Sequence, residues 1–324
     1  MQARTVRLEA FGGPEVMQLV DIDLPDPGPD EARIRHTAIG LNFIDTYHRT
    51  GLYPIELPGG LGTEAAGVVE AVGDAVSDVA PGDRVVYTGM PLGAYADARN
   101  YPAARLVPVP DAVGDEVAAA ILLKGLTAWY LLHGSYAVQA GDTVLFYAAA
   151  GGVGSIAVQW AKSLGVIVIG VVGSDEKAER ARSLGCDHTV LSDDDIVSTV
   201  REITNGAGVA AVYDSVGKDT FFTSLDCLRP HGVMVSFGNA SGPVEPFAPS
   251  ELAKRGSLYV TRPVLFDFVD TRERLLAASE QLFARVLDGS IHIDIGQRYA
   301  LAEVATAHHD LEARRTIGST IIEP

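Results

Sequence analysis

The stretch that decides the fold is residues 143–164, which read TVLFYAAAGGVGSIAVQWAKSL. Its first part, Thr143–Ala148, is an apolar run of strand length, and a glycine-rich turn follows it directly. Residues Val153–Leu164 then repeat apolar side chains at the spacing of one helix face, and Gly165 stands where a helix often ends. The order of strand, glycine turn and helix predicts the first unit of a dinucleotide-binding fold.

Further strand-like runs follow at a regular spacing after about Lys124. They are Val166–Val172, His188–Leu191, Val209–Ser215, Gly232–Phe237 and Ser257–Val260. Most are separated by segments that are able to form helices. Alternating strands and helices imply parallel pairing, so we expect an α/β fold with a doubly wound, Rossmann-type sheet of six strands.

The first 120 or so residues have a different character. Short strands such as Ala32–His36, Gly67–Val72 and Asp83–Tyr87 alternate with Gly- and Pro-rich turns, which predicts a second, mostly β domain. A helical pattern at Arg272–Leu287 precedes a short β-like tail that ends at Ile322 and is able to complete this domain. We therefore expect residues 1–124 with 264–324 to form the substrate domain and residues 125–263 the dinucleotide-binding domain.

The bulk composition narrows the possible partners. The chain has 324 residues and a net charge of −17, from 42 acidic and 25 basic side chains. Such a surface repels phosphates, so we expect neither nucleic acid nor a membrane as a partner. The two cysteines, Cys186 and Cys227, supply neither a disulfide framework nor a four-cysteine metal site. Without a signal-like N-terminus or a long uncharged apolar run, the expected location is cytoplasmic.

The glycine turn has the residue types that a pyrophosphate needs. It follows the G-x-G-x-x-G pattern with alanine at the first position, and its expected cofactor contacts are Ala150, Gly151, Gly152, Val153 and Gly154. Gly151 allows the backbone amides to approach the phosphates, and Gly154 lets the helix pack on the strand. The helix dipole favours the same anion. The alternative is a tight turn without a ligand.

The end of the second strand indicates which dinucleotide binds. An acidic residue there would favour NAD, but this strand ends at Gly173 and Ser174. These residues leave room for a 2′-phosphate, and Lys177 stands one turn into the next helix to neutralise it. NADPH is therefore the expected cofactor, although the acids Asp175 and Glu176 lie beside Lys177.

Several further motifs resemble one known family. Over essentially its whole length the chain resembles the medium-chain dehydrogenase/reductase superfamily, and within it the zinc-free quinone oxidoreductase branch, including bacterial NADPH:quinone reductases. The motifs that carry the resemblance are the glycine turn, 62–67 (GTEAAG), 81–85 (PGDRV), 40–54 (GLNFIDTYHRTGLYP), 123–128 (LKGLTA), 213–217 (YDSVG), 237–239 (FGN) and 257–263 (SLYVTRP). The resemblance implies a GroES-like β domain beside the Rossmann-type domain.

The resemblance also bears on metal binding. Zinc-dependent members hold a catalytic metal at two positions that carry Asn42 and Thr63 here, and neither side chain is a usual zinc ligand. The four-cysteine lobe is missing, and the adjacent His308 and His309 cannot share one helix face. We therefore expect no metal.

The resemblance further implies roles for single residues. Asn42 and Thr127 would lie by the nicotinamide and its ribose, and Tyr47 and Tyr53 would line a quinone pocket. The remaining expected contacts are Arg262 near the substrate, Arg314 near the cofactor, and Phe237, Gly238 and Asn239 after the fifth strand, where this fold binds cofactors. One position departs from the family, because Ser192 stands where related reductases carry a tyrosine that helps to hold the 2′-phosphate.

The sequence thus predicts NADPH-dependent reduction of quinones by direct hydride transfer without a metal. Two alternatives stay open: reduction of the activated C=C bond of an enone, and a non-catalytic role as an NADPH-binding protein. Relatives pair through sheet edges, so the apolar sixth strand, Ser257–Val260, predicts a homodimer.

Overall fold

The computed structural model describes residues 1–324, which form two compact units. The first unit comprises Met1–Lys124, Asp270–Leu287 and Ile293–Pro324, and the second comprises Gly125–Val269 and Asp288–His292. Helix α2 (Asp115–Tyr130) contributes residues to both units. Each unit is described by itself.

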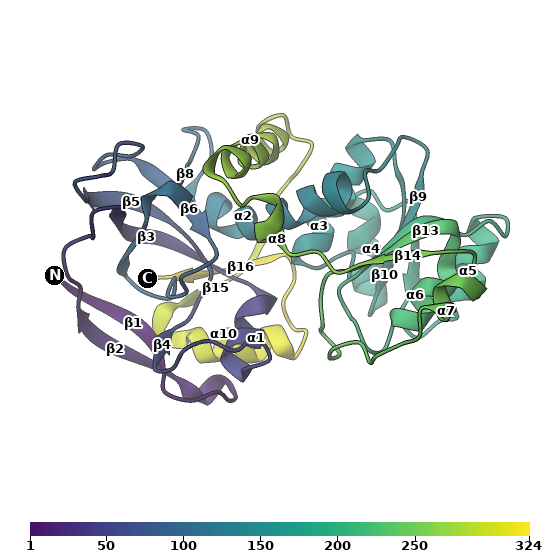
Figure 1. Ribbon diagram of the computed structural model, residues 1–324, viewed down its shortest axis with the longest axis horizontal. Helices are drawn as coiled ribbons and strands as arrows, with labels where there is room; N and C mark the ends of the chain where they lie inside the picture. The colour runs from purple at the N-terminus through teal and green to yellow at the C-terminus, as the bar shows by residue number, and fades with distance from the viewer. The chain divides into compact units, whose positions relative to one another are not determined.

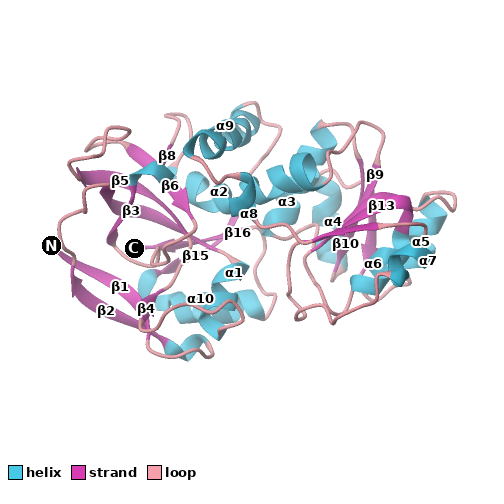
Figure 2. Cartoon of the chain, in the orientation of Figure 1, coloured by secondary structure: helices cyan, strands magenta, loops and turns pink.

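The second unit is built on a six-stranded parallel sheet (Figures 1 and 2). Its strand order is β11-β10-β9-β12-β13-β14, in which β9, the first strand of this unit, lies in the middle. This order confirms the doubly wound, Rossmann-type sheet predicted from the sequence. The strands are β9 (Thr143–Tyr147), β10 (Ile167–Val172), β11 (His188–Leu191), β12 (Val209–Asp214), β13 (Leu228–Ser236) and β14 (Tyr259–Thr261). The helices are α3 (Gly152–Ser163), α4 (Asp175–Ser183), α5 (Ile196–Ile203), α6 (Phe221–Cys227), α7 (Ser250–Lys254) and α8 (Leu265–Phe268).

The predicted limits of two strands were wrong. The sixth strand begins at Tyr259 rather than Ser257, because Gly256 and Ser257 both have a positive φ, 103° and 57°, which takes the chain out of the extended conformation just before Tyr259. The fifth strand begins at Leu228 rather than the predicted Gly232, and it contains an irregularity at His231, whose φ is 61°.

The first unit is mostly β structure, as predicted for a GroES-like domain (Figure 2). One sheet has the order β15-β16-β3-β5-β6-β8, with β7 also paired to β3, and a second sheet has the order β2-β1-β4. The strands are β1 (Gln2–Leu8), β2 (Met17–Asp23), β3 (Glu31–Leu41), β4 (Gly59–Gly60), β5 (Glu64–Val72), β6 (Arg84–Thr88), β7 (Ala98–Pro102), β8 (Val107–Pro108), β15 (Ile295–Ala300) and β16 (Ser319–Glu323). The C-terminal strand β16 pairs with β3, so the tail completes this unit as predicted.

Three α-helices lie wholly in the first unit: α1 (Phe43–Thr50), α9 (Arg272–Leu287) and α10 (Val304–Glu312). The sequence predicted α9 with its observed limits but missed α1. The sequence marks this helix only at its two ends. Asn42 and Asp45 form a capping box at its start, and Gly51 ends it with a φ of 80°.

Each unit has its own apolar core. In the first unit Val6, Ile34, Ile39, Leu61 and Ile322 are fully buried between the sheets. In the second unit the buried cluster includes Leu145, Ile169, Val212, Phe221 and Met234, from the strands and from α6. The alternation of strands and buried helix faces therefore gives each unit a separate hydrophobic interior.

One helical segment, Asp115–Ser135, is long and apolar enough to span a membrane by length and composition alone. Of its apolar window, 67% is buried inside the protein. That burial is the property of a core helix, and it accounts for the apolar composition without a bilayer.

Candidate functional site

The predicted cofactor residues of the second unit gather at one edge of its sheet. The strands β10, β9, β12 and β13 are neighbours and run parallel, so their carboxyl ends meet at this edge. The glycine turn follows β9, Gly173 and Ser174 follow β10, and Phe237–Asn239 follow β13. Strand order reverses direction at β9, and ligands of this fold bind where that reversal occurs.

The glycine turn brings helix α3 very close to strand β9. A Cβ on Gly154 would lie 2.2 Å from the Ala148 carbonyl oxygen and 2.8 Å from two Ala149 backbone atoms. Only glycine therefore fits at the start of α3. The first N–H groups of this helix, from Gly152 and Val153, have no acceptor within the helix and lie at the positive end of its dipole. This end of the turn is suited to an anion.

Gly173, at the position where this fold distinguishes NADPH from NADH, has open space around it. No atom lies within 4 Å of a Cβ built on Gly173. Ser174 is the N-cap of α4, and its side chain accepts a hydrogen bond from the Lys177 backbone N–H at 3.3 Å. Lys177 is half-buried, whereas Asp175, Glu176 and Ser192 are exposed. A cap hydroxyl and one lysine thus lie in the first turn of α4.

A buried carboxylate that the sequence analysis did not single out shapes the same edge. Asp214, at the end of β12, is fully buried and accepts hydrogen bonds from the N–H groups of Val216 and Gly217 and from the hydroxyls of Thr220 and Ser224. It fixes the turn after β12, and this turn holds the loop after β13. A Cβ on Gly238 would lie only 2.4 Å from the Ser215 carbonyl oxygen. The sequence contained one sign of this role, because Asp214 is the acid at the end of an otherwise apolar strand.

In the first unit, helix α1 organises three of the predicted residues. Asn42 is its N-cap and is 4% exposed, Tyr47 lies within it, and Tyr53 follows it. The rings of Tyr47 and Tyr53 meet edge to face with centroids 5.1 Å apart, and both residues are half-buried. Phe43 packs on Tyr47 in the same manner, at 5.5 Å. The structure thus places Asn42 at the start of α1, Tyr47 within it and Tyr53 just after its end.

The Asn42 side chain is held by a buried acid. Its Nδ2 donates to Glu64 Oε2 at 2.8 Å, and Glu64 Oε1 accepts from the Leu123 N–H at 2.7 Å. Lys124 Nζ lies 3.8 Å from Glu64 Oε2 and donates to the Leu41 carbonyl at 3.2 Å. Burial raises the pKa of Glu64 and lowers that of Lys124, and each charge opposes the shift of the other.

A second buried polar chain begins at Asp45. Its carboxylate accepts from the Thr63 hydroxyl at 2.9 Å, the Tyr95 hydroxyl at 2.8 Å and the Asn42 backbone N–H at 2.9 Å. Burial raises the pKa of Asp45 to about 6, although these donors oppose the shift. Asn42 and Thr63, the positions of zinc ligands in zinc-dependent members, are therefore both engaged with carboxylates of the protein.

The series of buried hydrogen bonds that begins at Asp45 continues from Tyr95 toward the surface. His308 Nε2 lies 3.0 Å from the Tyr95 hydroxyl, and Arg49 donates to His308 Nδ1 at 3.0 Å. These partners assign the Nε2–H tautomer, and burial together with the Arg49 charge lowers the pKa of His308 to about 3. Arg49 also forms a bidentate pair with Glu312 at 3.0 and 2.7 Å, which joins α1 to α10 (Figure 1). His308 is fully buried and His309 is exposed, which confirms that the two do not share a face.

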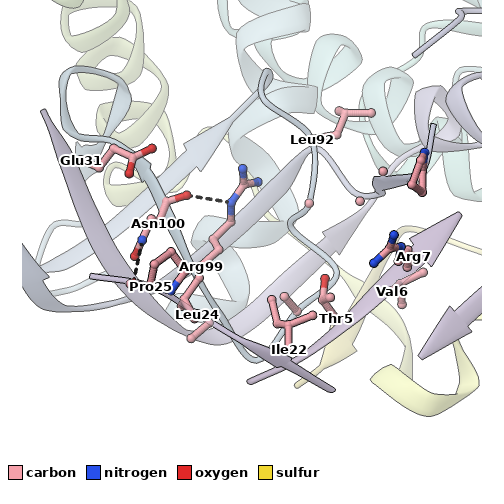
Figure 3. A pocket seen from close by; sticks show the side chains of 16 residues that line it. Thr5, Val6, Arg7, Ile22, Leu24, Pro25, Glu31, Leu92, Arg99 and Asn100 are labelled. Atoms are coloured by element: carbon pink, nitrogen blue, oxygen red, sulfur yellow. Dashed lines mark hydrogen bonds between the residues drawn. The ribbon is translucent and has the colours of Figure 1, made fainter. Parts of the chain in front are cut away.

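A cavity of about 520 Å³ in the first unit contains none of the predicted residues (Figure 3). Arg99 lines it, but its guanidinium stacks over the Tyr101 ring at 4.8 Å and donates to the Pro91 carbonyl at 3.0 Å. Asn100 donates to the Pro25 carbonyl. These polar groups hold the loops around β7.

The remaining predicted residues are placed separately. Thr127 is half-buried in α2, Arg262 is exposed after β14 and donates to the Pro263 carbonyl, and Arg314 is exposed after α10 with a φ of 59°. The two cysteines are buried, and burial raises the pKa of each thiol to about 12. Neither thiol is poised to react.

Comparisons with known proteins give consistent matches along the whole chain. The family described as alcohol dehydrogenase GroES-like domain matches residues 28–111, and that described as zinc-binding dehydrogenase matches residues 152–278. A quinone oxidoreductase of Pseudomonas aeruginosa is 52% identical and covers 99% of this chain and 100% of the relative. A 2-haloacrylate reductase of a Burkholderia species is 48% identical, and the match covers 97% of this chain and 96% of the relative. The crystal structure of Escherichia coli quinone oxidoreductase complexed with NADPH matches with a TM-score of 0.97 at 47% identity. The match covers 99% of this chain and 100% of that one.

Proposed function

Because the chain belongs to the quinone oxidoreductase branch of the medium-chain dehydrogenase/reductase superfamily, we propose that it reduces quinone-like acceptors with NADPH. The observation that carries the proposal is the sheet edge of the second unit. There a close-packed glycine turn, an open position at Gly173 and a lysine at 177 suit a dinucleotide with a 2′-phosphate. The E. coli relative binds NADPH with a chain of the same fold.

The residues present fit this cofactor. Ala150–Gly154 would hold the pyrophosphate with backbone N–H groups, and Gly173, Ser174 and Lys177 would hold the 2′-phosphate. Asn42 and Thr127 would lie by the nicotinamide and its ribose, and Phe237–Asn239 and Arg314 would be further cofactor contacts. When bound, NADPH supplies a hydride, and the protein positions it and stabilises the charge that develops on the acceptor.

We further propose that the reaction needs no metal. The support lies in the donor set, since Asn42 uses its amide nitrogen as a donor to Glu64, and Thr63 donates to Asp45. Neither group resembles the thiolate or imidazole that zinc prefers. A quinone is already electron-poor, so alignment and stabilisation of the developing oxyanion suffice for hydride transfer.

Tyr47 and Tyr53 are the proposed acceptor contacts, with Arg262 as a polar contact. Two tyrosine rings that meet edge to face present flat apolar surface and hydroxyl groups, which suits an aromatic acceptor. A second candidate activity is reduction of an activated C=C bond. It is favoured by the 48% identity to a 2-haloacrylate reductase, because an acrylate has a double bond conjugated to its carboxylate.

Replacing Lys177 tests the choice of cofactor. We expect Lys177→Met to weaken NADPH binding about tenfold or more, because a charge-assisted hydrogen bond to phosphate is lost, and to leave NADH binding within about twofold. Titration of both nicotinamides by fluorescence measures this. Lys162→Met, on the exposed face of α3, is the control for a general loss of positive charge. Equal weakening of NADPH and NADH would contradict the role of Lys177.

We also propose that the chain is a soluble, cytoplasmic homodimer. Strand β14 is an edge strand of the parallel sheet, and Tyr259 on it is 61% exposed, so a second copy is able to pair there. Sedimentation of the purified chain as a monomer would contradict the dimer.

A further inference from the structure

The strand order of the second unit separates the two halves of a bound dinucleotide. Gly173 and Ser174, the proposed contacts of the 2′-phosphate, follow β10, whereas β12 and β13 lie on the other side of β9. A dinucleotide lies across this point of the sheet, with its pyrophosphate at the glycine turn. The 2′-phosphate belongs to the adenosine half, so the nicotinamide half would extend over the segments that follow β12 and β13.

These two segments are bonded to each other. The loop after β13, residues 237–242, lies on the turn after β12, residues 215–219. Ser241 makes two hydrogen bonds to the Val216 carbonyl, from its N–H at 2.8 Å and from its hydroxyl at 3.0 Å. The same hydroxyl accepts from the Asp219 N–H at 3.1 Å. The first three residues of the loop are predicted cofactor contacts, and the loop takes its position from the turn.

Asp214 holds the turn in place, and its two carboxylate oxygens have different partners. Oδ1 accepts from the N–H groups of Val216 and Gly217 at 2.7 and 3.1 Å, which fixes the turn. Oδ2 accepts from the hydroxyls of Thr220 and Ser224 at 2.7 and 2.8 Å, which fixes the start of α6. The fully buried Asp214 side chain therefore links α6 to the turn and, through the turn, to the loop after β13.

We propose that Asp214 is a positioning residue for the nicotinamide half of NADPH. It holds the turn 215–219, and through Ser241 the loop 237–242, where they contact this half of the cofactor. The inference rests on the proposed function, in which this sheet edge binds NADPH. The contacts of the 2′-phosphate follow β10 and make none of these hydrogen bonds. Loss of the Asp214 carboxylate therefore weakens the contacts to one half of the cofactor and spares the other.

A ligand that lacks the nicotinamide separates this role from a general loss of structure. Adenosine 2′,5′-bisphosphate has the 2′-phosphate but no nicotinamide, so it probes the β10 side alone. For Asp214→Ala we expect NADPH to bind about tenfold more weakly and the bisphosphate to bind within about twofold of wild type. Asp214→Asn is expected to keep both affinities within about twofold. Its Oδ1 still accepts from the turn, and the two hydroxyls are able to rotate and accept from its Nδ2.

A milder pair of variants covers the case in which Asp214→Ala does not fold, since alanine leaves four donors without their acceptor. Ser241→Ala removes the hydroxyl that joins the loop to the turn. We expect it to weaken NADPH binding about fivefold and to leave bisphosphate binding unchanged. Ser224→Ala is the matched control, because it removes one hydrogen bond of Asp214 on the α6 side only. Neither affinity is expected to change measurably in this control.

NADPH binding is measured by fluorescence titration and bisphosphate binding by titration calorimetry. Equal weakening of both ligands in Asp214→Ala and Ser241→Ala, or wild-type NADPH affinity in both, would overturn the positioning role. If Asp214→Ala does not fold, the Ser241→Ala result decides. A wild-type chain that does not bind NADPH would refute the proposed function itself, and this inference with it. A wild-type chain that binds both ligands, with variants that bind them equally well, would refute the inference alone.

Discussion

Gly154→Ala is expected to weaken NADPH binding by about a hundredfold and to destabilise the second unit by about 1–3 kcal/mol. The added Cβ would lie 2.2 Å from the Ala148 carbonyl oxygen and 2.8 Å from Ala149 backbone atoms. These are backbone atoms of the turn that follows β9, so no side-chain rotation relieves the contact. Helix α3 must move away from the strand and take its free N–H groups with it.

The matched control for this change is Gly114→Ala. No atom lies within 4 Å of a Cβ at Gly114, which precedes α2 and has no positive φ. Alanine there is expected to leave cofactor affinity near wild type and to lower the free energy of unfolding by no more than about 1 kcal/mol, because alanine is a poorer N-cap than glycine. A Gly154→Ala chain with wild-type affinity for NADPH would show that the turn does not hold the pyrophosphate.

Arg49→Met is expected to lower the free energy of unfolding by about 3 kcal/mol, because it removes a buried guanidinium and leaves buried acceptors without their donor. The Arg49 side chain is 1% exposed and donates to Glu312, to His308 and to the Gly12 carbonyl. Methionine fills the space but leaves these three acceptors without their donor. Since Arg49 lies in the last turn of α1, we also expect a weaker attachment of the element that contains Tyr47.

Arg298→Met is the control for Arg49→Met. Arg298 and Glu116 form a comparable bidentate pair in the same unit, but their side chains are 46% and 42% exposed. Solvent-exposed pairs contribute little to stability, so the urea midpoint should not change measurably. If both variants unfolded alike, burial would not be the reason for the stability of the Arg49 pair.

Much of the fold was predictable because its signals are local. The run of apolar residues before the glycine turn and the helical spacing after it indicated β9 and α3, and the alternation that follows indicated a parallel sheet. Helix α1 was missed, because its eight residues are too few for a periodic pattern and its capping box is the main sign. The domain division at 124/125 and 263/264 remains a prediction.

The site was predictable only in part. Residues that follow strands could be assigned to one sheet edge, since parallel strands end together. The partners of Asn42 were not accessible in this way. Glu64 is 22 residues from Asn42 in the sequence, and Lys124 pairs with it only through the packing of α2 against β3 and β5. Glu64 begins strand β5, and its pairing depends on tertiary structure.

The measurement that tests the central claim most directly is NADPH oxidation by the chain after exhaustive treatment with EDTA. Benzoquinone, phenanthrenequinone and an α,β-unsaturated ketone serve as acceptors, and NADH is run in parallel with NADPH. We predict rapid turnover with NADPH and the quinones, slower turnover with the ketone and with NADH, and no gain on adding zinc. Tight NADPH binding without quinone turnover, or turnover that depends on zinc, would contradict the account.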